Sequence, residues 1–242
     1  MCGRYTQLMP WSELVRLYGI TDPGPAINLP PRYNVAPTQE VPIVRKTADG
    51  GRDLSLVRWG LVPSWAKDVT IGAKMINARA ETVEKLPSFR AAFRQRRCLV
   101  VADGFYEWRN TGGDRKQPYH IRPAEEEAFA FAGLWERWKT RHGEWLHSFT
   151  IIVTSANDFL RPIHDRMPVI LPPNRFDDWL NLDLPFERTK ALLRPFDGPI
   201  TAAPVSRRVN SVRVDDEGNV RPAAPPVTGQ GRTKIPLPVA IA

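Results

Sequence analysis

Apolar residues recur along the chain at two spacings, and these spacings predict its secondary structure. Between Pro10 and Gly19, apolar side chains stand at positions 11, 14, 15, 17 and 18, the spacing of one face of a short helix. Two apolar runs, 41–45 and 54–59, flank the turn-forming residues 48–51 and predict a β-hairpin. The chain therefore begins with mixed secondary structure.

The rest of the pattern favours strands. Short apolar or alternating runs predict further strands at 98–102, 105–109, 119–122, 128–135, 145–154, 169–171 and 200–205. Longer amphipathic stretches predict helices at 89–97, 174–181 and 186–193, and Asn157 is expected to cap a short helix ending at Leu160. Residues 23–38 are rich in turn formers and predict a loop. The predicted fold class is α+β, rich in strands.

Length and composition indicate one domain with a tail. A β-rich domain can reach about 250 residues, so the 242 residues fit a single domain at 2–214. From residue 215 to 242, Pro, Gly and isolated apolar residues lack a period, which predicts a disordered tail. No stretch approaches the 18 apolar residues of a membrane span, and we expect a cytoplasmic protein.

The charge and the cysteines narrow the function classes. A net charge of +8 suits polyanionic partners without identifying one. The two cysteines, Cys2 and Cys98, are expected to stay reduced, and Cys98 lies in an apolar run typical of a buried strand. With no CxxC or HExxH motif and four His residues, a structural zinc site is not expected.

The first two residues carry distinctive chemistry. Removal of Met1 would leave Cys2 with a free α-amine beside its thiol. Such an amine has a pKa of about 7.7, so a substantial fraction is neutral at pH 7 and can attack an aldehyde. The neighbouring thiol can then close a five-membered thiazolidine ring. From the residues alone, a small side chain tolerated near the start of the chain is the favoured explanation of position 2.

Two aromatic and basic segments have open interpretations. In the segment 59–66, Trp59 ends a strand and is expected in the core, whereas Trp65 precedes polar residues and can act as a stacking platform for bases. The predicted helix at 89–97 places Arg90, Arg94 and Arg96 along its polar side. This side is either a solvated face or a contact for nucleic acid.

Two titratable residues have settings that can alter their pKa. In the strand 105–109, Glu107 shares one face with Phe105, and aromatic residues flank it in sequence. Burial there would raise the pKa of the carboxyl, although a Glu in a strand often faces solvent. His164 lies between a Pro-interrupted loop and a short apolar strand, in a more site-like setting than the other three histidines.

Six motifs, taken together and in order, resemble the SRAP family, the SOS-response-associated, peptidase-like proteins that crosslink to abasic sites in single-stranded DNA. The resemblance runs over residues 2 to about 210 and does not extend to the tail. The motifs are Cys2-Gly-Arg-Tyr5, Arg32-Tyr-Asn-Val-Ala-Pro-Thr38, Trp59-Gly-Leu-Val-Pro-Ser-Trp-Ala66, Met75-Ile-Asn-Ala-Arg-Ala-Glu-Thr82, Gly104-Phe-Tyr-Glu-Trp108 and His164-Asp-Arg-Met-Pro-Val-Ile-Leu171.

The resemblance implies a fold and a set of roles. The fold would consist of curved β-sheets forming a barrel-like core with peripheral helices, and a basic channel would lead to the amino terminus. Cys2 would form the crosslink, Asn77 would orient it, Glu107 would transfer protons, and His164 would help to open the abasic sugar. The implied DNA contacts are Arg4, Trp65, Arg79 and, more weakly, Thr154.

The resemblance also implies the partners. The expected partner is single-stranded DNA containing abasic sites, bound by a monomer without cofactor or metal, and the protein would be associated with the nucleoid when bound. Two alternatives remain open at this point. One is a hydrolase that uses Cys2 as an amino-terminal nucleophile, and the other is a module that binds single strands without a covalent bond.

Overall fold

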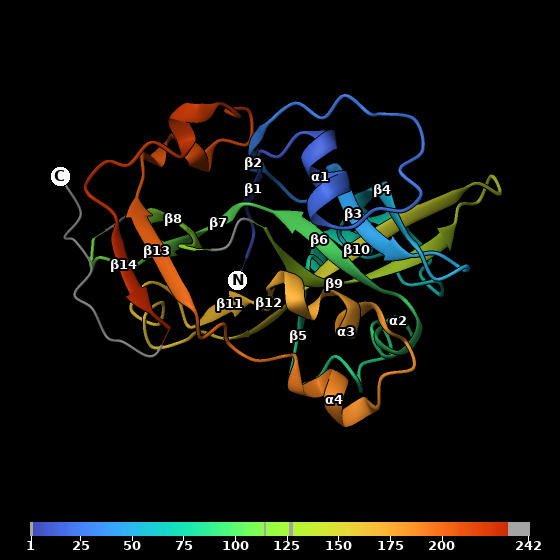
Figure 1. Cartoon of the computed structure of the whole chain (residues 1–242). Coiled ribbons are helices and arrows are strands. Elements are labelled where there is room, and N and C mark those ends of the chain that lie inside the picture. Colours follow the sequence, from blue (N-terminus) through green and yellow to red (C-terminus); the bar gives the residue numbers. More distant parts are fainter. Residues whose placement is uncertain (1, 114, 126–127, 232–242) are drawn as a thin grey trace.

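A closed five-stranded barrel forms the centre of the molecule (Figure 1). The computed structural model describes residues 2–113, 115–125 and 128–231. Around the barrel, β10 pairs with β4, β4 with β3, β3 with β6, β6 with β9, and β9 again with β10. The barrel strands are β3 (Glu40–Lys46), β4 (Arg52–Trp59), β6 (Arg97–Ala102), β9 (Phe129–Lys139) and β10 (Trp145–Ser155).

Alternation along these strands builds two separate cores. Every second residue points into the barrel, where Ile43, Val100, Phe131 and Ile151 belong to one buried cluster. The residues between them point outward, and Leu99 and Ile152 belong to a second cluster. Both faces of β6 are therefore apolar, as the continuous run at 98–102 predicts.

A second sheet of six strands lies beside the barrel, in the order β14-β13-β8-β7-β1-β2. It brings both ends of the described chain into one sheet, since β1 and β14 belong to it. Its strands are β1 (Tyr5–Gln7), β2 (Arg32–Val35), β7 (Gly104–Arg109), β8 (Gln117–Pro123), β13 (Pro199–Pro204) and β14 (Val227–Gln230). Three short strands extend the barrel sheet: β5 (Asn77–Arg79), β11 (Arg166–Pro168) and β12 (Ile170–Leu171).

Short helices cover the outward-facing core. Phe93, Phe176 and Trp179 bury their rings in the second cluster, and the Trp179 indole donates a hydrogen bond to the Cys98 carbonyl at 2.8 Å. None of the helices among the described residues has the length and apolar character needed to cross a membrane. The helical segments are α1 (Trp11–Leu17), η1 (Val69–Lys74), α2 (Arg90–Gln95), η2 (Pro173–Arg175), α3 (Phe176–Leu180), α4 (Phe186–Ala191), η3 (Arg207–Asn210) and η4 (Glu217–Asn219).

The α+β fold class and the barrel-like core are confirmed, and two local predictions are wrong. The segment 32–38 was expected to be irregular, yet its first half forms β2, because β1 supplies an antiparallel partner. The helix expected after Asn157 is a series of turns, although Asn157 does accept a hydrogen bond from the Leu160 amide at 2.9 Å. Both cysteines are free, as expected.

The tail prediction needs correction as far as Gly231. Residues 215–231 contain η4 and β14, and β14 pairs with β13 at the edge of the second sheet. Residues 232–242 lie outside the described residues. The domain boundary at residue 214 stays a prediction. Composition alone missed this order because the pairing of β14 with β13 depends on the completed sheet and not on an apolar period within the segment.

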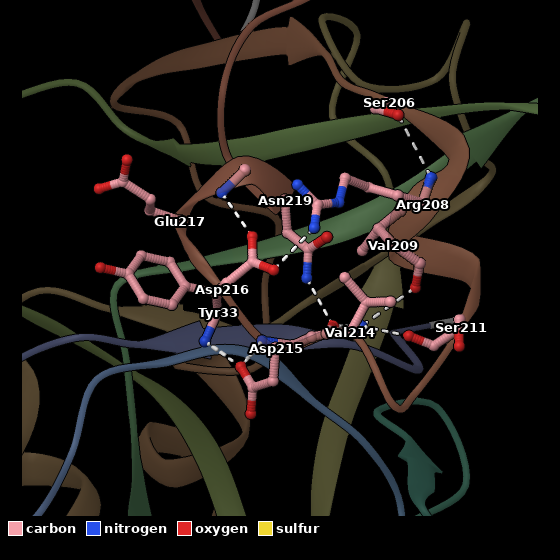
Figure 2. A network of polar contacts seen from close by, with 12 residues as sticks. Tyr33, Ser206, Arg208, Val209, Ser211, Val214, Asp215, Asp216, Glu217 and Asn219 are labelled. Atoms are coloured by element: carbon pink, nitrogen blue, oxygen red, sulfur yellow. Dashed lines mark hydrogen bonds and ion pairs between the residues drawn. The ribbon is translucent and has the colours of Figure 1, made fainter.

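Asp215 is the main link between this segment and the amino-terminal part of the chain (Figure 2). Its carboxylate accepts hydrogen bonds from the backbone amides of Tyr33 at 2.6 Å and Asn34 at 2.9 Å, both in β2. It also pairs with the Arg32 guanidinium at 2.6 Å. Hydrogen bonds to a charged group contribute about 1.5–3 kcal/mol each, so this carboxylate holds β2 firmly.

We expect Asp215→Asn to lower the free energy of unfolding by about 2 kcal/mol, because the neutral amide loses the ion pair and one oxygen acceptor. Denaturant unfolding of both proteins measures the difference. A matched control is Glu217→Gln, whose exposed ion pair with Arg221 should contribute less than about 1 kcal/mol. Equal losses for the two variants would contradict the role of Asp215.

Candidate active site

Strand β1 positions the amino-terminal residues between the two sheets. It pairs with β2 on one side and β7 on the other. The Tyr5 ring enters the barrel, with its centroid 5.2 Å from that of Trp59 and 5.9 Å from that of Phe131. Because Tyr5 is anchored in this way, Cys2 lies only three residues from a fixed point.

Cys2 is fully buried, and its backbone is held from the opposite sheet. The Asn77 amide donates a hydrogen bond to the Cys2 carbonyl at 2.8 Å. Asn77 in turn is fixed by β5, which runs parallel to β10 with Asn77 opposite Ile151. The Asn77 Oδ1 atom is buried and has no hydrogen-bond partner among the described residues, so it can accept a hydrogen bond from a group that enters the site.

Glu107 lies in β7 with only 3% of its surface exposed. Phe105, on the same face of β7, belongs to the barrel cluster, whereas Tyr106 packs in a separate cluster on the other face, which confirms the alternation predicted from the sequence. Burial raises the pKa of Glu107 to about 7, and the positive charge of the amino terminus opposes this rise. The carboxyl therefore exists in both protonation states near neutral pH.

Burial also raises the pKa of the Cys2 thiol well above its usual range, and the negative charge of Glu107 raises it further. The thiol is therefore uncharged at neutral pH. Because the thiolate is the nucleophilic form, Cys2 needs a base close by in order to react.

His164 faces Glu107 from the loop before β11. Its Nε2 atom lies 3.8 Å from Glu107 Oε2, which is longer than a hydrogen bond. The Arg166 amide donates to His164 Nδ1 at 2.9 Å, so the neutral ring carries its proton on Nε2, toward Glu107. Asp165 Oδ1 is also 3.0 Å from Nδ1, but that nitrogen cannot donate a hydrogen bond to Asp165 while it accepts one from the Arg166 amide. Burial lowers the pKa of His164 and favours the neutral ring.

The structure thus brings together the four residues that the sequence predicts as catalytic. They come from the amino terminus, β5, β7 and the loop before β11. Together they place a thiol, a primary amide, a carboxyl with a pKa of about 7 and a neutral imidazole at one site. Among the described residues, no group of three or more His, Cys, Asp or Glu side chains is arranged to hold a metal ion.

The predicted DNA contacts differ in accessibility. Trp65 is 56% exposed in the turn after β4, whereas Trp59 is fully buried, as expected. Arg79 is exposed at the end of β5, two residues from Asn77. Thr154 in β10 is only 4% exposed, so its side chain offers little surface to a ligand.

Arg4 has structural partners that the sequence did not predict. Its guanidinium donates to Asn34 Oδ1 and to the Val209 carbonyl, both at 2.8 Å, and to the Asn210 carbonyl at 3.3 Å. Asn34 is buried and donates in addition to the Ser211 and Val214 carbonyls. Arg4 therefore joins the amino terminus to the segment around η3, and its contact with DNA stays a prediction.

The basic face of α2 is only partly free. Arg96 pairs with Glu136 at 2.7 Å, and Arg97 is buried and donates to the Trp179, Phe93 and Asn181 carbonyls. Arg90 and Arg94 are exposed. The choice between a solvated face and a nucleic-acid contact remains open for these two residues.

Comparisons with known proteins show which family the chain belongs to. The family model described as SOS response associated peptidase (SRAP) matches residues 1–212. The abasic site processing protein YoaM of Bacillus subtilis is 42% identical over 213 residues, covering 87% of this chain and 93% of the relative. The abasic site processing protein HMCES of Gallus gallus is 36% identical over 217 residues, covering 76% of this chain and 64% of that protein. A crystal structure of a protein from Bacteroides thetaiotaomicron superimposes with a TM-score of 0.83 at 29% identity, covering 92% of this chain and all of that one.

The raised pKa of Glu107 predicts a dependence of stability on pH. A buried carboxyl with a pKa of about 7 binds its proton more tightly in the folded state than in the unfolded state, where its pKa is about 4.3. The stabilisation that this bound proton gives to the folded state is therefore fully present below about pH 4 and is lost as the pH rises toward 7. Above about pH 7 the free energy of unfolding no longer changes on account of Glu107. Glu107→Gln, which cannot ionise, should become more stable than the parent by up to about 3 kcal/mol across this range.

Denaturant unfolding of parent and variant at several pH values tests this expectation. The exposed Glu125 provides a control for the substitution itself, because Glu125→Gln makes the same chemical change outside the buried site. A constant difference between Glu107→Gln and the parent over this range would mean that Glu107 has an ordinary pKa.

Proposed function

Because the chain belongs to the SOS response associated peptidase (SRAP) family, we propose that it captures abasic sites in single-stranded DNA through a covalent bond to Cys2. The relatives named abasic site processing proteins support a role at abasic sites in the response to DNA damage. The observation that carries the proposal is the convergence of Cys2, Asn77, Glu107 and His164 at one buried site. The protein would act at the nucleoid when bound to DNA.

The proposed reaction begins once Met1 is removed. The neutral α-amine of Cys2 attacks the aldehyde carbon of the open abasic sugar and forms a carbinolamine, which loses water to give an imine. The thiol sulfur then adds to the imine carbon, and the thiol proton goes to the nitrogen. The product is a thiazolidine, and the net change is the loss of one water molecule.

Proton transfer is the task of the neighbouring side chains. The buried, uncharged thiol requires a base, and a carboxyl with a pKa of about 7 can accept that proton and return it. His164 directs its Nε2 proton toward the same carboxyl and can donate to the sugar ring oxygen as the ring opens. Asn77 holds the Cys2 carbonyl and offers its free oxygen to the amine or to a sugar hydroxyl.

Binding of the strand requires groups outside the buried site. Arg79 is exposed beside Asn77 and suits a phosphate, while the exposed ring of Trp65 suits a base. These contacts would hold the lesion over Cys2 before the covalent step. Binding would be electrostatic in large part and would weaken with salt.

The main alternative is a hydrolase in which the Cys2 thiol attacks an amide. The family description as a peptidase favours this alternative. Such an enzyme needs hydrogen-bond donors for the oxyanion of its intermediate. In the structure the Asn77 amide is already donating to Cys2 itself, which fits a residue that positions the amino terminus better than an oxyanion donor.

The first prediction of the proposal separates the amine from the thiol. A peptide tag fused before Cys2 keeps the thiol but converts the amine to an amide, so adduct formation on an oligonucleotide with one abasic site should be lost. Cleavage of the tag to expose Cys2 should restore it. A denaturing gel measures the adduct.

Substitutions of Cys2 complete this test. Cys2→Ala keeps the amine, so it should give only a labile imine that borohydride traps. Full crosslinking by the tagged protein would rule out the thiazolidine and leave direct thiol chemistry.

The second prediction concerns Arg79. Each phosphate neutralised on a single strand contributes about −0.7 to the slope of log affinity against log salt, so Arg79→Ala should make the slope shallower by about 0.7. Titration of an undamaged strand at several salt concentrations measures it. Arg188→Ala, which removes an exposed charge on α4, should leave the slope unchanged. If both variants keep the parent slope, Arg79 is not a phosphate contact.

A further inference from the structure

The ends of β9 and β10 form a hairpin that projects beyond the barrel, at the right of Figure 1. The positions that face the barrel interior recur at every second residue, and beyond the core the same positions are accessible to solvent. There they are occupied by cations and aromatic rings in place of aliphatic core residues. We call this set the hairpin face, and it consists of Arg45 from β3 together with Trp135, Arg137, Lys139, Trp145 and His147.

The cations of the hairpin face lie against its rings. The Arg45 guanidinium is 4.7 Å from the centroid of Trp135, and the Arg137 guanidinium is 5.1 Å from that of Trp145. The Lys139 ammonium is 5.7 Å from the same Trp145 ring. Trp145 is nevertheless 56% exposed, so much of this large apolar ring remains in water.

Arg137 and Lys139 have no carboxylate partner among the described residues. Arg45 is neutralised by Asp53 at 2.7 Å. Glu136 points to the opposite side of the hairpin, where it pairs with Arg96. The hairpin face therefore presents two cations without a carboxylate partner in the described part of the chain, beside a half-exposed indole, a surface complementary to a phosphate backbone that carries bases.

The hairpin face is separate from the Cys2 site. Trp145 lies six positions along β10 from Ile151, the residue opposite Asn77, which corresponds to about 20 Å of extended strand. The barrel core lies between them, since Phe149 packs on Trp59 inside it. A ligand held by Trp145 cannot be the same nucleotide that reacts at Cys2.

We propose that the hairpin face is a second contact surface for single-stranded DNA, with phosphates bound by Arg137 and Lys139 and a base stacked on Trp145. It shares with the proposed function only the premise that the partner is DNA. An acidic peptide would satisfy the two cations but would leave the exposed ring without a stacking partner. For this reason we assign the surface to nucleic acid.

Binding of an undamaged single strand of about 16 nucleotides tests the proposal. By fluorescence anisotropy, Trp145→Ala should weaken binding about thirtyfold, the middle of the range for one stacked base. Trp145→Phe should recover part of the loss, and Arg137→Gln should make the salt slope shallower by about 0.7. The matched control is Phe186→Ala, which removes another exposed ring that lies near a lysine, Lys190 on α4, and should bind like the parent.

Crosslinking on a short strand of about 4 nucleotides with the lesion near its centre should be the same for Trp145→Ala and the parent, because the one or two nucleotides on either side of the lesion do not reach from Cys2 around the barrel to Trp145. A failure of the crosslinking chemistry would leave the binding measurements interpretable. Parent-like affinity of Trp145→Ala for the long strand would overturn the proposal. A competition experiment gives a second outcome that would overturn it. If polyglutamate displaces the strand from the parent but not from Arg137→Gln, and Trp145→Ala binds like the parent, the ligand is an acidic peptide.

Discussion

The structure depends on the immobilisation of its amino terminus by a strand of only three residues. Terminal residues usually fray because few contacts oppose their conformational entropy. Here β1 is bonded on both edges, and the Tyr5 ring is inserted among Trp59 and Phe131 in the barrel. The large buried area of an aromatic ring and the two-sided hydrogen bonding together offset the cost of ordering the terminus.

The same burial that holds Cys2 also determines its chemistry. Removal from water makes the thiol a poor acid and makes Glu107 a weak enough acid to keep its proton to about pH 7. In a polar, exposed site the carboxyl would be ionised throughout the neutral range and could act only as a base. Desolvation therefore gives one carboxyl access to both protonation states, which a reaction with several proton transfers requires.

The sequence predicts those parts of the fold that depend on local pattern. The long apolar runs of β6, β9 and β10 were placed correctly, and alternation along β7 correctly separated Glu107 from Tyr106. By contrast, β2 was missed because its residues carry no apolar period and its pairing comes from β1. The fixing of Asn34 by Asp215 was also missed, because the two residues are 181 positions apart and their contact depends on the completed fold. Motif resemblance, and not periodicity, identified Asn77, since nothing local marks an amide that must reach the Cys2 carbonyl.

The barrel also explains why the polar residues of the hairpin face begin where they do. Interior positions of a five-stranded barrel are filled by side chains, so they must be apolar wherever the strands enclose them. Along β10 this holds for Phe149, Ile151 and Val153, whereas His147 and Trp145, in the same register, lie where β9 and β10 leave the barrel. The change from apolar to cationic and aromatic residues therefore marks the end of the enclosed core. A rigid, dry core between the two polar regions keeps their separation fixed, so neither region needs the other in order to keep its geometry.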